Sequence, residues 1–159
     1  MRGTPLMLQL LIWYFGPYYL WGMPIGGYKF TAVILGCSMN YAAYFAEIYR
    51  SGIESIPRGQ YEAAQLLGYD KRQTFMKIIL PQMVKNVLPA VTNEVITLVK
   101  DTSLVYSVSY IELFATARQI AAAETTVLPL FMAGVFYYVF NYLVAWIMER
   151  FEKKLSYYH

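Results

Sequence analysis

The most constraining feature of this chain is the alternation of long apolar tracts with short polar connections. Four tracts are apolar enough to suggest membrane crossing, and they cover approximately residues 5–21, 28–49, 83–110 and 125–148. A membrane-spanning helix needs about 20 mostly apolar residues, because its backbone must satisfy its own hydrogen bonds in lipid. Composition agrees, since 58% of the residues are hydrophobic and 14% are charged, against about 25% charged in soluble domains. We therefore predict an all-α integral membrane protein, a helical bundle of about four spans.

The scarcity of cysteine and histidine excludes several kinds of chemistry. Cys37 is the single cysteine, and the single histidine is the terminal residue, His159. An intrachain disulfide, a CxxC metal pair and a histidine-based catalytic triad are therefore ruled out. The chain also lacks the GxxxxGK[ST] phosphate loop, and its formal charge of +3 forms no nucleic-acid-binding face. We expect no enzyme activity, no metal site, no cofactor and no nucleic-acid partner.

The most polar stretch lies between the second and third apolar tracts, from Tyr61 to Pro81. It predicts two short helices joined by a tight corner at Gly68, because glycine enters the left-handed region without a Cβ penalty. Asp70 can cap the second helix, with Gln73 as its capping-box partner. On the first helix, Ala63, Ala64 and Leu67 are expected to form a small apolar patch beside the charge of Glu62. Such a hairpin is suited to docking into a groove of another protein.

The same stretch carries a spaced motif. Its fixed positions are Glu62, Ala63 and Ala64, then Gly68 after three residues, Ile78 after nine more, and Leu80 and Pro81 after one more. This pattern resembles the EAA-x3-G-x9-I-x-L-P signature of ABC importer permeases, and every fixed position is present. The alternative interpretation is an ordinary amphipathic helical hairpin on a membrane protein.

The resemblance implies a role for the hairpin and a set of partners. Residues 57–81 would form a cytoplasmic coupling loop, seated in a separate ABC ATPase subunit that hydrolyses ATP. A second permease subunit, identical or different, would complete the path, and an extracytoplasmic binding protein would deliver the substrate. The chain would then be a single permease domain, residues 1–159, in the lipid bilayer of a bacterial inner membrane.

The third apolar tract is unusually polar for a span. A charge at the centre of a membrane helix costs about 2.5–3.5 kcal/mol on insertion scales unless water or a partner compensates. The segment from Lys100 to Leu104 resembles polar amino acid permeases, in which this region lies near the translocation path. The alternative is that Thr102 and Ser103 only bond their own helix while Lys100 and Asp101 lie at the outer interface. The candidate path residues are Asn93, Glu94, Lys100, Asp101, Thr102 and Ser103.

The beginning of the chain carries a second resemblance to polar amino acid permeases. Arg2, Gly3, Thr4 and Pro5 are followed by a Leu-x-x-Gln-Leu pattern, as at the start of the second membrane helix of those proteins. The family core normally has five spans, so the expectation is a chain without the usual first helix. A polar amino acid is the expected cargo, with opines, metal complexes and other small polar solutes left open.

The distribution of basic residues predicts the orientation. With four spans and the polar loop inside, both termini are cytoplasmic, and ten basic residues lie inside against three outside or in the membrane. This asymmetry is what the positive-inside rule requires. The three are Lys29, Lys100 and Arg118; the ten are Arg2, Arg50, Arg58, Lys71, Arg72, Lys77, Lys85, Arg150, Lys153 and Lys154.

Two other functions are compatible with part of the pattern. A stand-alone secondary transporter would use Glu94 and Asp101 as ion relays, but such carriers often contain inverted repeats, and no repeat is visible. A membrane scaffold with a docking loop would transport nothing and would tolerate changes at 100–103. The primary interpretation is an importer permease subunit.

Overall fold

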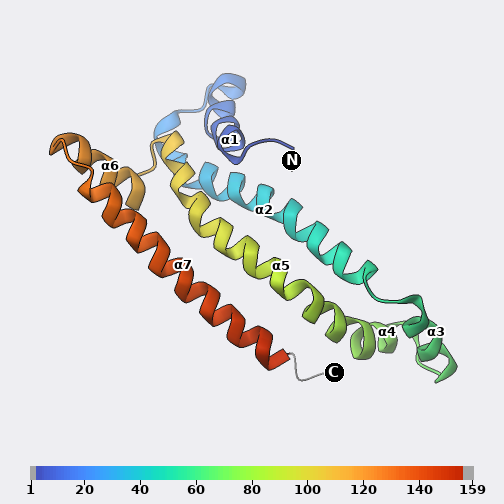
Figure 1. Cartoon of the computed structure of the whole chain (residues 1–159). Helices are drawn as coiled ribbons and strands as arrows, with labels where there is room; N and C mark the ends of the chain where they lie inside the picture. The colour runs from blue at the N-terminus through green and yellow to red at the C-terminus, as the bar shows by residue number, and fades with distance from the viewer. Residues whose placement is uncertain (1–2, 156–159) are drawn as a thin grey trace. The chain divides into compact units, whose positions relative to one another are not determined.

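The computed structural model describes residues 3–155, and all regular structure in that range is helical (Figure 1). The prediction of an all-helical chain is therefore confirmed. Arg2, counted above among the cytoplasmic cations, lies outside the described residues. In chain order the helices are α1 (Leu6–Trp21), η1 (Ile25–Gly27), α2 (Lys29–Glu54), α3 (Arg58–Leu66), α4 (Lys71–Thr74), the π-helical turn η2 (Phe75–Ile79), α5 (Leu80–Asp101), the 3-10 helix η3 (Thr102–Val108), α6 (Leu113–Ala123) and α7 (Leu128–Leu155).

The chain divides into two compact units. The first contains the described residues up to Tyr44 together with Val95–Val144, and the second contains Phe45–Glu94 together with the described residues from Ala145 onward. Helices α2, α5 and α7 each contribute to both units. The motif of Glu62 to Pro81 belongs to the second unit, whereas Lys100 to Ser103 belong to the first.

In the first unit, α1 packs against η3, which also contacts α6. The buried residues of α1 are Leu6, Gln9, Leu10 and Tyr14, which recur at the spacing of one helix face. The side-chain amide of Gln9 donates to the hydroxyl of Thr4 at 2.9 Å and to its carbonyl at 3.1 Å. The polar residues of this N-terminal segment therefore close the start of α1.

The third apolar tract differs from the predicted single span over 83–110. The α-helix ends at Asp101, and the chain continues as a 3-10 helix to Val108. The hydroxyl of Thr102 donates to the carbonyl of Val99 at 2.7 Å, and that of Ser103 donates to the carbonyl of Lys100 at 2.8 Å. These side chains compete with the backbone donors that would extend the α-helix.

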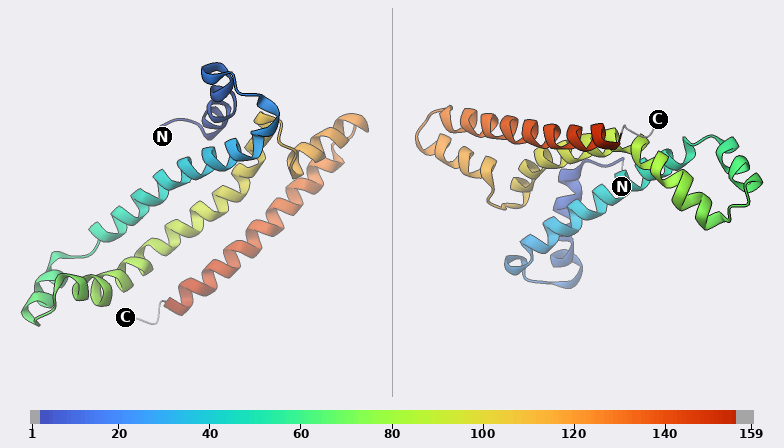
Figure 2. Two further views of the ribbon diagram at one scale, coloured as in Figure 1. Left: turned by 180° about the vertical axis from the view of Figure 1, so that it is seen from behind. Right: turned by 90° about the horizontal axis from the view of Figure 1, so that it is seen from below.

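In the second unit, the end of α2 lies very close to the beginning of α5. A Cβ added to Gly52 would overlap the side chain of Val87 and lie 3.3 Å from Met83. The amide of Asn86 also donates to the hydroxyl of Ser55 at 2.9 Å. Figure 2 shows the hairpin of α3 and α4 from two further directions, with α3 contacting both α4 and η2. The hairpin is therefore attached to two packed helix ends.

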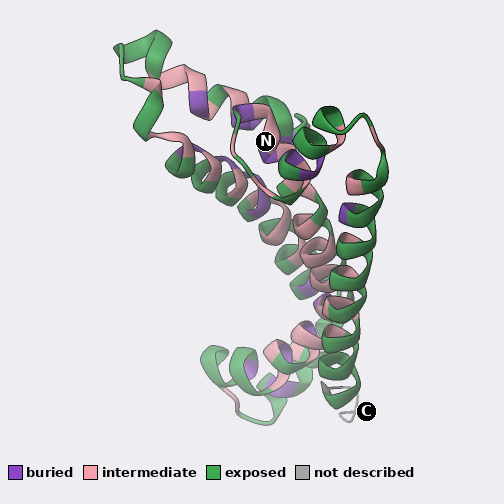
Figure 3. Ribbon diagram, turned by 90° about the vertical axis from the view of Figure 1, so that its left-hand side faces the viewer, coloured by how far each residue is buried: buried purple, intermediate pink, exposed green. Residues whose placement is uncertain are grey.

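Among the described residues, one helix meets a length and apolarity criterion for crossing a membrane, namely Leu128–Lys154. Only 6% of its most apolar window is buried within the chain, and most of α7 is exposed in Figure 3. The surface includes Phe131, Phe136, Tyr138 and Tyr142. An exposed apolar surface of this length is typical of a helix whose solvent is lipid or another protein.

Candidate functional site: the hairpin and the Asp101 segment

The corner of the hairpin is closed by backbone hydrogen bonds. Gly68 has φ +78°, and its N–H donates to the carbonyl of Gln65 at 3.0 Å. The N–H of Tyr69 donates to the carbonyl of Ala64, also at 3.0 Å. This pair of bonds is a Schellman motif with glycine in the left-handed position after the helix. The predicted role of Gly68 in the turn is confirmed.

The second arm of the hairpin, which consists of α4 and η2, begins with the predicted capping box. The backbone N–H of Gln73 donates to the carboxylate of Asp70 at 2.7 Å, and the N–H of Asp70 donates to the side-chain oxygen of Gln73 at 3.2 Å. The hydroxyl of Thr74 donates to the carbonyl of Asp70 at 2.8 Å. The capping box therefore satisfies the N–H groups of Asp70 and Gln73 within four residues of sequence.

The prediction of a separate hairpin at Tyr61–Pro81 implied that the second arm ends before the following helix begins. In the structure, the second arm runs into that helix without a break. Helix α4 passes directly into the π-helical turn η2, which passes into α5 at Leu80. The N–H of Leu80 bonds to the carbonyl of Phe75, and the side chain of Gln82 donates to the carbonyl of Ile78 at 2.9 Å. Pro81 follows at once, and proline has no N–H for the helical ladder. The wide turn and the Gln82 bond accommodate the proline without ending the helix.

The first arm of the hairpin is α3, and the residues predicted to form one apolar patch on it do not share one surface. Ala64 is 1% exposed, while Ala63 and Glu62 are exposed. Leu67 is 75% exposed and Leu66, which the motif does not specify, is 90% exposed. The grouping of Ala64 with Leu67 in one patch was wrong, because Ala64 is buried whereas Leu67, which follows the last residue of α3, is exposed. The outward surface is therefore formed by Glu62, Ala63, Leu66 and Leu67.

The motif residues that follow the corner differ in exposure. Ile78 and Leu80 are half-buried and Pro81 is exposed, while Ile79, which the motif does not specify, is fully buried. Phe75, at the start of η2, is 38% exposed. Lys77 lies over the ring of Tyr69 at 5.7 Å from its centroid, a distance typical of a cation–π contact. Ala64 is therefore a buried motif position, whereas Glu62, Ala63, Gly68 and Pro81 are exposed at the surface.

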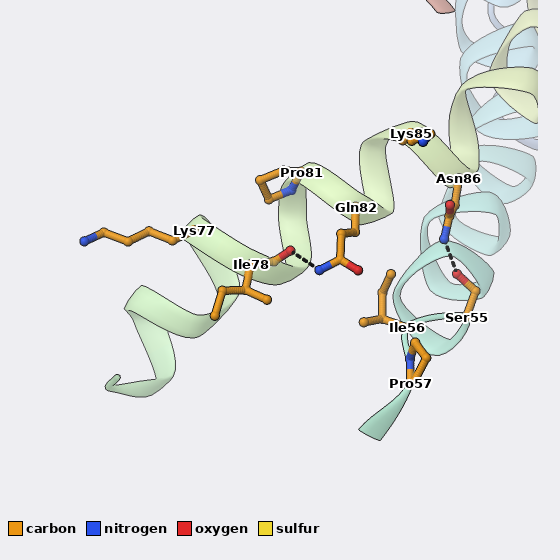
Figure 4. Close-up of a pocket in the computed structure, with 9 residues that line it drawn as sticks. All are labelled: Ser55, Ile56, Pro57, Lys77, Ile78, Pro81, Gln82, Lys85 and Asn86. Atoms are coloured by element: carbon orange, nitrogen blue, oxygen red, sulfur yellow. Dashed lines mark hydrogen bonds between the residues drawn. The ribbon is translucent and has the colours of Figure 1, made fainter. Parts of the chain in front are cut away.

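A groove of about 520 Å³ lies at the base of the hairpin (Figure 4). The hydrogen bonds from Gln82 to Ile78 and from Asn86 to Ser55 lie along it, so its amide groups are engaged within the second unit. Its lining residues are Ser55, Ile56, Pro57, Lys77, Ile78, Pro81, Gln82, Lys85 and Asn86.

The candidate path residues occupy different environments. Asn93 is exposed and Glu94 is half-buried on α5, in the second unit. In the first unit, Lys100 is exposed and Asp101 is half-buried. The Asp101 carboxylate accepts a 2.8 Å hydrogen bond from the phenol of Tyr41 on α2. The hydroxyls of Thr102 and Ser103 donate to their own helix, as one alternative for this segment predicted.

A second polar cluster in the first unit was not predicted. The Glu112 carboxylate caps α6 by accepting the N–H groups of Phe114 and Ala115, both at 2.7 Å. It also accepts the hydroxyl of Tyr137 on α7 at 3.0 Å. A cavity of about 250 Å³ lies beside this cluster, lined also by Val99 and Thr102. Glu112 is the N-cap residue of α6, and an acidic residue before an apolar helical segment is the sequence signal for such a cap.

Across residues 3–155, no group of three or more His, Cys, Asp or Glu side chains is arranged to hold a metal ion. The carboxylates of Asp70, Asp101 and Glu112 accept hydrogen bonds from a phenol or from N–H groups at helix N-termini.

Comparison with known proteins places this arrangement in context. Residues 1–157 match the family described as "Binding-protein-dependent transport system inner membrane component". The arginine transport system permease protein ArtQ of Bacillus subtilis is 42% identical over 156 residues, which cover 98% of this chain and 70% of ArtQ. The putative glutamine transport system permease protein GlnP of Rickettsia bellii is 39% identical, covering 97% of this chain and 70% of that protein.

A solved structure is also similar. A chain from the crystal structure of an amino acid ABC transporter with histidines aligns with a TM-score of 0.84 at 34% identity, over 96% of this chain and 71% of that chain. The helical order, the spaced motif on the hairpin and these similarities lead to one assignment. The chain belongs to the inner-membrane permease components of binding-protein-dependent ABC transporters.

Proposed function

We propose that the chain is a permease subunit of an ATP-driven importer and forms, with a second permease subunit, the translocation path for a polar amino acid. The names of its relatives support this cargo class, because they specify arginine and glutamine transport. The similar crystal structure is likewise of an amino acid transporter. An extracytoplasmic binding protein delivers the cargo, and a separate ABC ATPase subunit hydrolyses ATP.

The hairpin of residues 57–81 is the proposed cytoplasmic coupling loop. The observation that carries this proposal is that the full motif falls on a folded hairpin whose corner and caps are closed by its own hydrogen bonds. Its outward residues Glu62, Ala63, Leu66 and Leu67 combine one charge with a flat apolar surface. An exposed leucine pair at the tip of a rigid hairpin is suited to a groove on a soluble partner.

The same proposal gives the hairpin a way to transmit force. Its second arm continues without a break through η2 into α5, so the docked end and a membrane helix share one backbone. Closure of the ATPase dimer would move the hairpin and thereby bias α5 between two packing states. Three motif residues lie where the second arm passes into α5, namely Ile78 in η2 and Leu80 and Pro81 at the start of α5.

The membrane arrangement follows from the same model of function. We assign α1, α2, α5 and α7 as four spans of a single permease domain, with the hairpin and both termini of this chain on the cytoplasmic side. The supporting arguments are the positive-inside asymmetry and the apolar surface of α7. Helix α1 has 16 residues, about 24 Å at 1.5 Å per residue, so it would rely on flanking residues to cross.

The proposed path is lined by polar residues of α5 and the segment after it. Glu94, Asn93, Lys100 and Asp101 supply charged and amide groups that an amino acid zwitterion requires. Thr102 and Ser103 contribute to the path by shaping its backbone, because their hydroxyls donate hydrogen bonds to the carbonyls of Val99 and Lys100. Asp101 is the anion to which a cargo ammonium or guanidinium group would bind.

The docking proposal is tested by charge reversal at the hairpin. Glu62→Lys should reduce co-purification of the ATPase with the permease at least severalfold, since rim charges that oppose a partner's field weaken association. Glu152→Lys makes the same charge change at an exposed position of α7 and serves as the control. If both variants retain the ATPase equally at low and high salt, Glu62 does not contact it.

The apolar part of the docking surface needs its own variant. Leu66→Ser should weaken ATPase retention further than Glu62→Lys, because Leu66 is 90% exposed in the isolated chain and would be desolvated on docking. Met76→Ser, at a residue 54% exposed on the second arm, is the matched control. Retention of the ATPase by Leu66→Ser would place the docking surface elsewhere.

Uptake measurements separate the importer from the other two functions. Proteoliposomes containing the complete complex should accumulate labelled L-arginine or L-glutamine when ATP and a binding protein are present. A secondary transporter would accumulate cargo on an ion gradient without ATP. A scaffold would accumulate nothing, and it would tolerate Asp101→Ala without consequence.

A further inference from the structure

The carboxylate of Asp101 is held by a residue that no sequence motif identified. Tyr41 lies on α2, and its phenol donates to Oδ2 of Asp101 at 2.8 Å. The tyrosine is 7% exposed, whereas Asp101 is half-buried. The bond therefore joins a buried ring to the carboxylate of a residue that is partly exposed.

The hydroxyls that follow Asp101 in sequence are committed to other acceptors. Thr102 and Ser103 donate to the carbonyls of Val99 and Lys100, at 2.7 Å and 2.8 Å. These two residues therefore shape the end of the α-helix, while the hydroxyl that reaches the Asp101 carboxylate comes from a different helix. The hydroxyl that donates to Asp101 is therefore brought there by the packing of one helix against another.

We infer that Tyr41 is a positioning residue for cargo recognition, which fixes the Asp101 carboxylate so that Oδ1 faces the ammonium or guanidinium group of the cargo. The inference rests on the proposed function, in which Asp101 lies on the translocation path. A carboxylate has two oxygens with about four lone-pair positions, and the phenol occupies a position on one oxygen only. Its second oxygen can then accept a charge-assisted hydrogen bond from the cargo.

Orientation matters here because a binding group must be held close to its productive geometry. An aspartate turns about two side-chain torsions, and a hydrogen bond from a packed ring removes that freedom before the cargo arrives. The ring of Tyr41 packs against that of Tyr44, with centroids 6.4 Å apart. The donor is therefore itself anchored, as a positioning group needs to be.

The test removes the hydroxyl and keeps the ring. Tyr41→Phe is compared with Tyr49→Phe, the same chemical change at a tyrosine that is 44% exposed on the same helix. The readout is the Kd of labelled L-arginine or L-glutamine, whichever the wild-type complex accumulates, for the permease–ATPase complex without binding protein. Tyr41→Phe should raise Kd about tenfold, the size expected when a hydrogen bond to a charged group is lost. Tyr49→Phe should leave Kd unchanged.

A double-mutant cycle with Asp101→Asn distinguishes a positioning role from a structural one. If Tyr41 acts through Asp101, adding Tyr41→Phe to Asp101→Asn should change Kd by less than about twofold, because coupled residues are non-additive. Thermal stability and ATPase retention should match wild type in all three variants. A full tenfold increment in the Asp101→Asn background, or a loss of stability that accounts for the change, overturns the inference.

Failure of the inference and failure of the proposed function give different results. If Asp101→Asn weakens binding while Tyr41→Phe binds like wild type, Tyr41 does not position the carboxylate and the path assignment survives. If Asp101→Asn binds and transports like wild type, Asp101 is not on the path and the inference falls with it. If the wild-type complex shows no ATP-dependent uptake, the proposed function itself is wrong.

Discussion

The hairpin and the Asp101 segment are both polar stretches, but they are organised in opposite ways. In the hairpin, Gly68, Asp70 and Gln73 are satisfied by partners within five residues. At Asp101 the observed partner is Tyr41, 60 residues earlier in the chain. The hairpin is thus largely a local structure, whereas the environment of Asp101 depends on how two helices pack.

Under the proposed function, this difference has a functional counterpart. A coupling element has to keep its shape while it is moved, and short-range caps hold a helical hairpin together independently of the membrane helices. A cargo site has to change between states, and a hydrogen bond between two helices can be made or broken when they shift. Changes in the hairpin should therefore alter ATPase coupling, and changes at Asp101 should alter cargo affinity.

The largest expected effect is that of Asp101→Ala on transport. Uptake at subsaturating cargo should fall roughly 10–100-fold, because interactions of charged groups contribute about 1.5–3 kcal/mol. ATPase retention should be normal, as measured by co-purification. Glu152→Ala, at an exposed position of α7 outside the proposed path, is the control. Equal losses in the two variants would mean that the loss does not come from removing an anion of the path.

The next effect concerns the base of the hairpin, where tertiary packing does enter. Gly52→Ala places a methyl group on Val87, and overpacking of this kind typically costs about 1–3 kcal/mol. The thermal midpoint of the solubilised protein should fall. Gly59→Ala, where nothing lies within 4 Å of the added Cβ, should be neutral or slightly stabilising in a helix. Identical midpoints for the two variants would contradict the close approach of α2 and α5.

A moderate effect is expected at the corner. Gly68→Val imposes a β-branched residue on a φ of +78°, at a cost of roughly 1–2 kcal/mol or more. ATPase stimulation by loaded binding protein should drop severalfold while cargo Kd stays unchanged. Gly68→Asn is the control, since asparagine accepts the left-handed conformation. A shift of cargo Kd in Gly68→Val would show that the two regions are not separable.

The smallest effect is that of removing the cap. Asp70→Ala should cost about 1 kcal/mol of local stability, visible as faster amide hydrogen exchange at Gln73 and Thr74. Exchange around Asp101 should be unaffected. Unchanged exchange at Gln73 would mean that the capping box contributes nothing to the hairpin, and that packing of Ala64 and Ile79 alone maintains it.

The local features of this protein could be read from its residues alone. Helical class, the corner at Gly68 and the capping box at Asp70 each depend on backbone preferences and hydrogen bonds spanning a few residues, which short patterns encode. The burial of Ala64 apart from its neighbours and the unbroken passage into α5 were missed. The first depends on how α3 contacts α4 and η2, and the second on a π-helical turn just before Pro81.

Tertiary structure alone determined which groups meet across the chain. Nothing in the pattern around Tyr41 distinguishes it from the protein's other tyrosines, yet packing places its hydroxyl on Asp101. Glu112 and Tyr137 likewise meet across 25 residues of sequence. Sequence by itself determined the helices, the motif and the membrane character, because these follow from local preference and apolar content. Packing decided the partners of the buried polar groups, because such contacts depend on distances that no local pattern specifies.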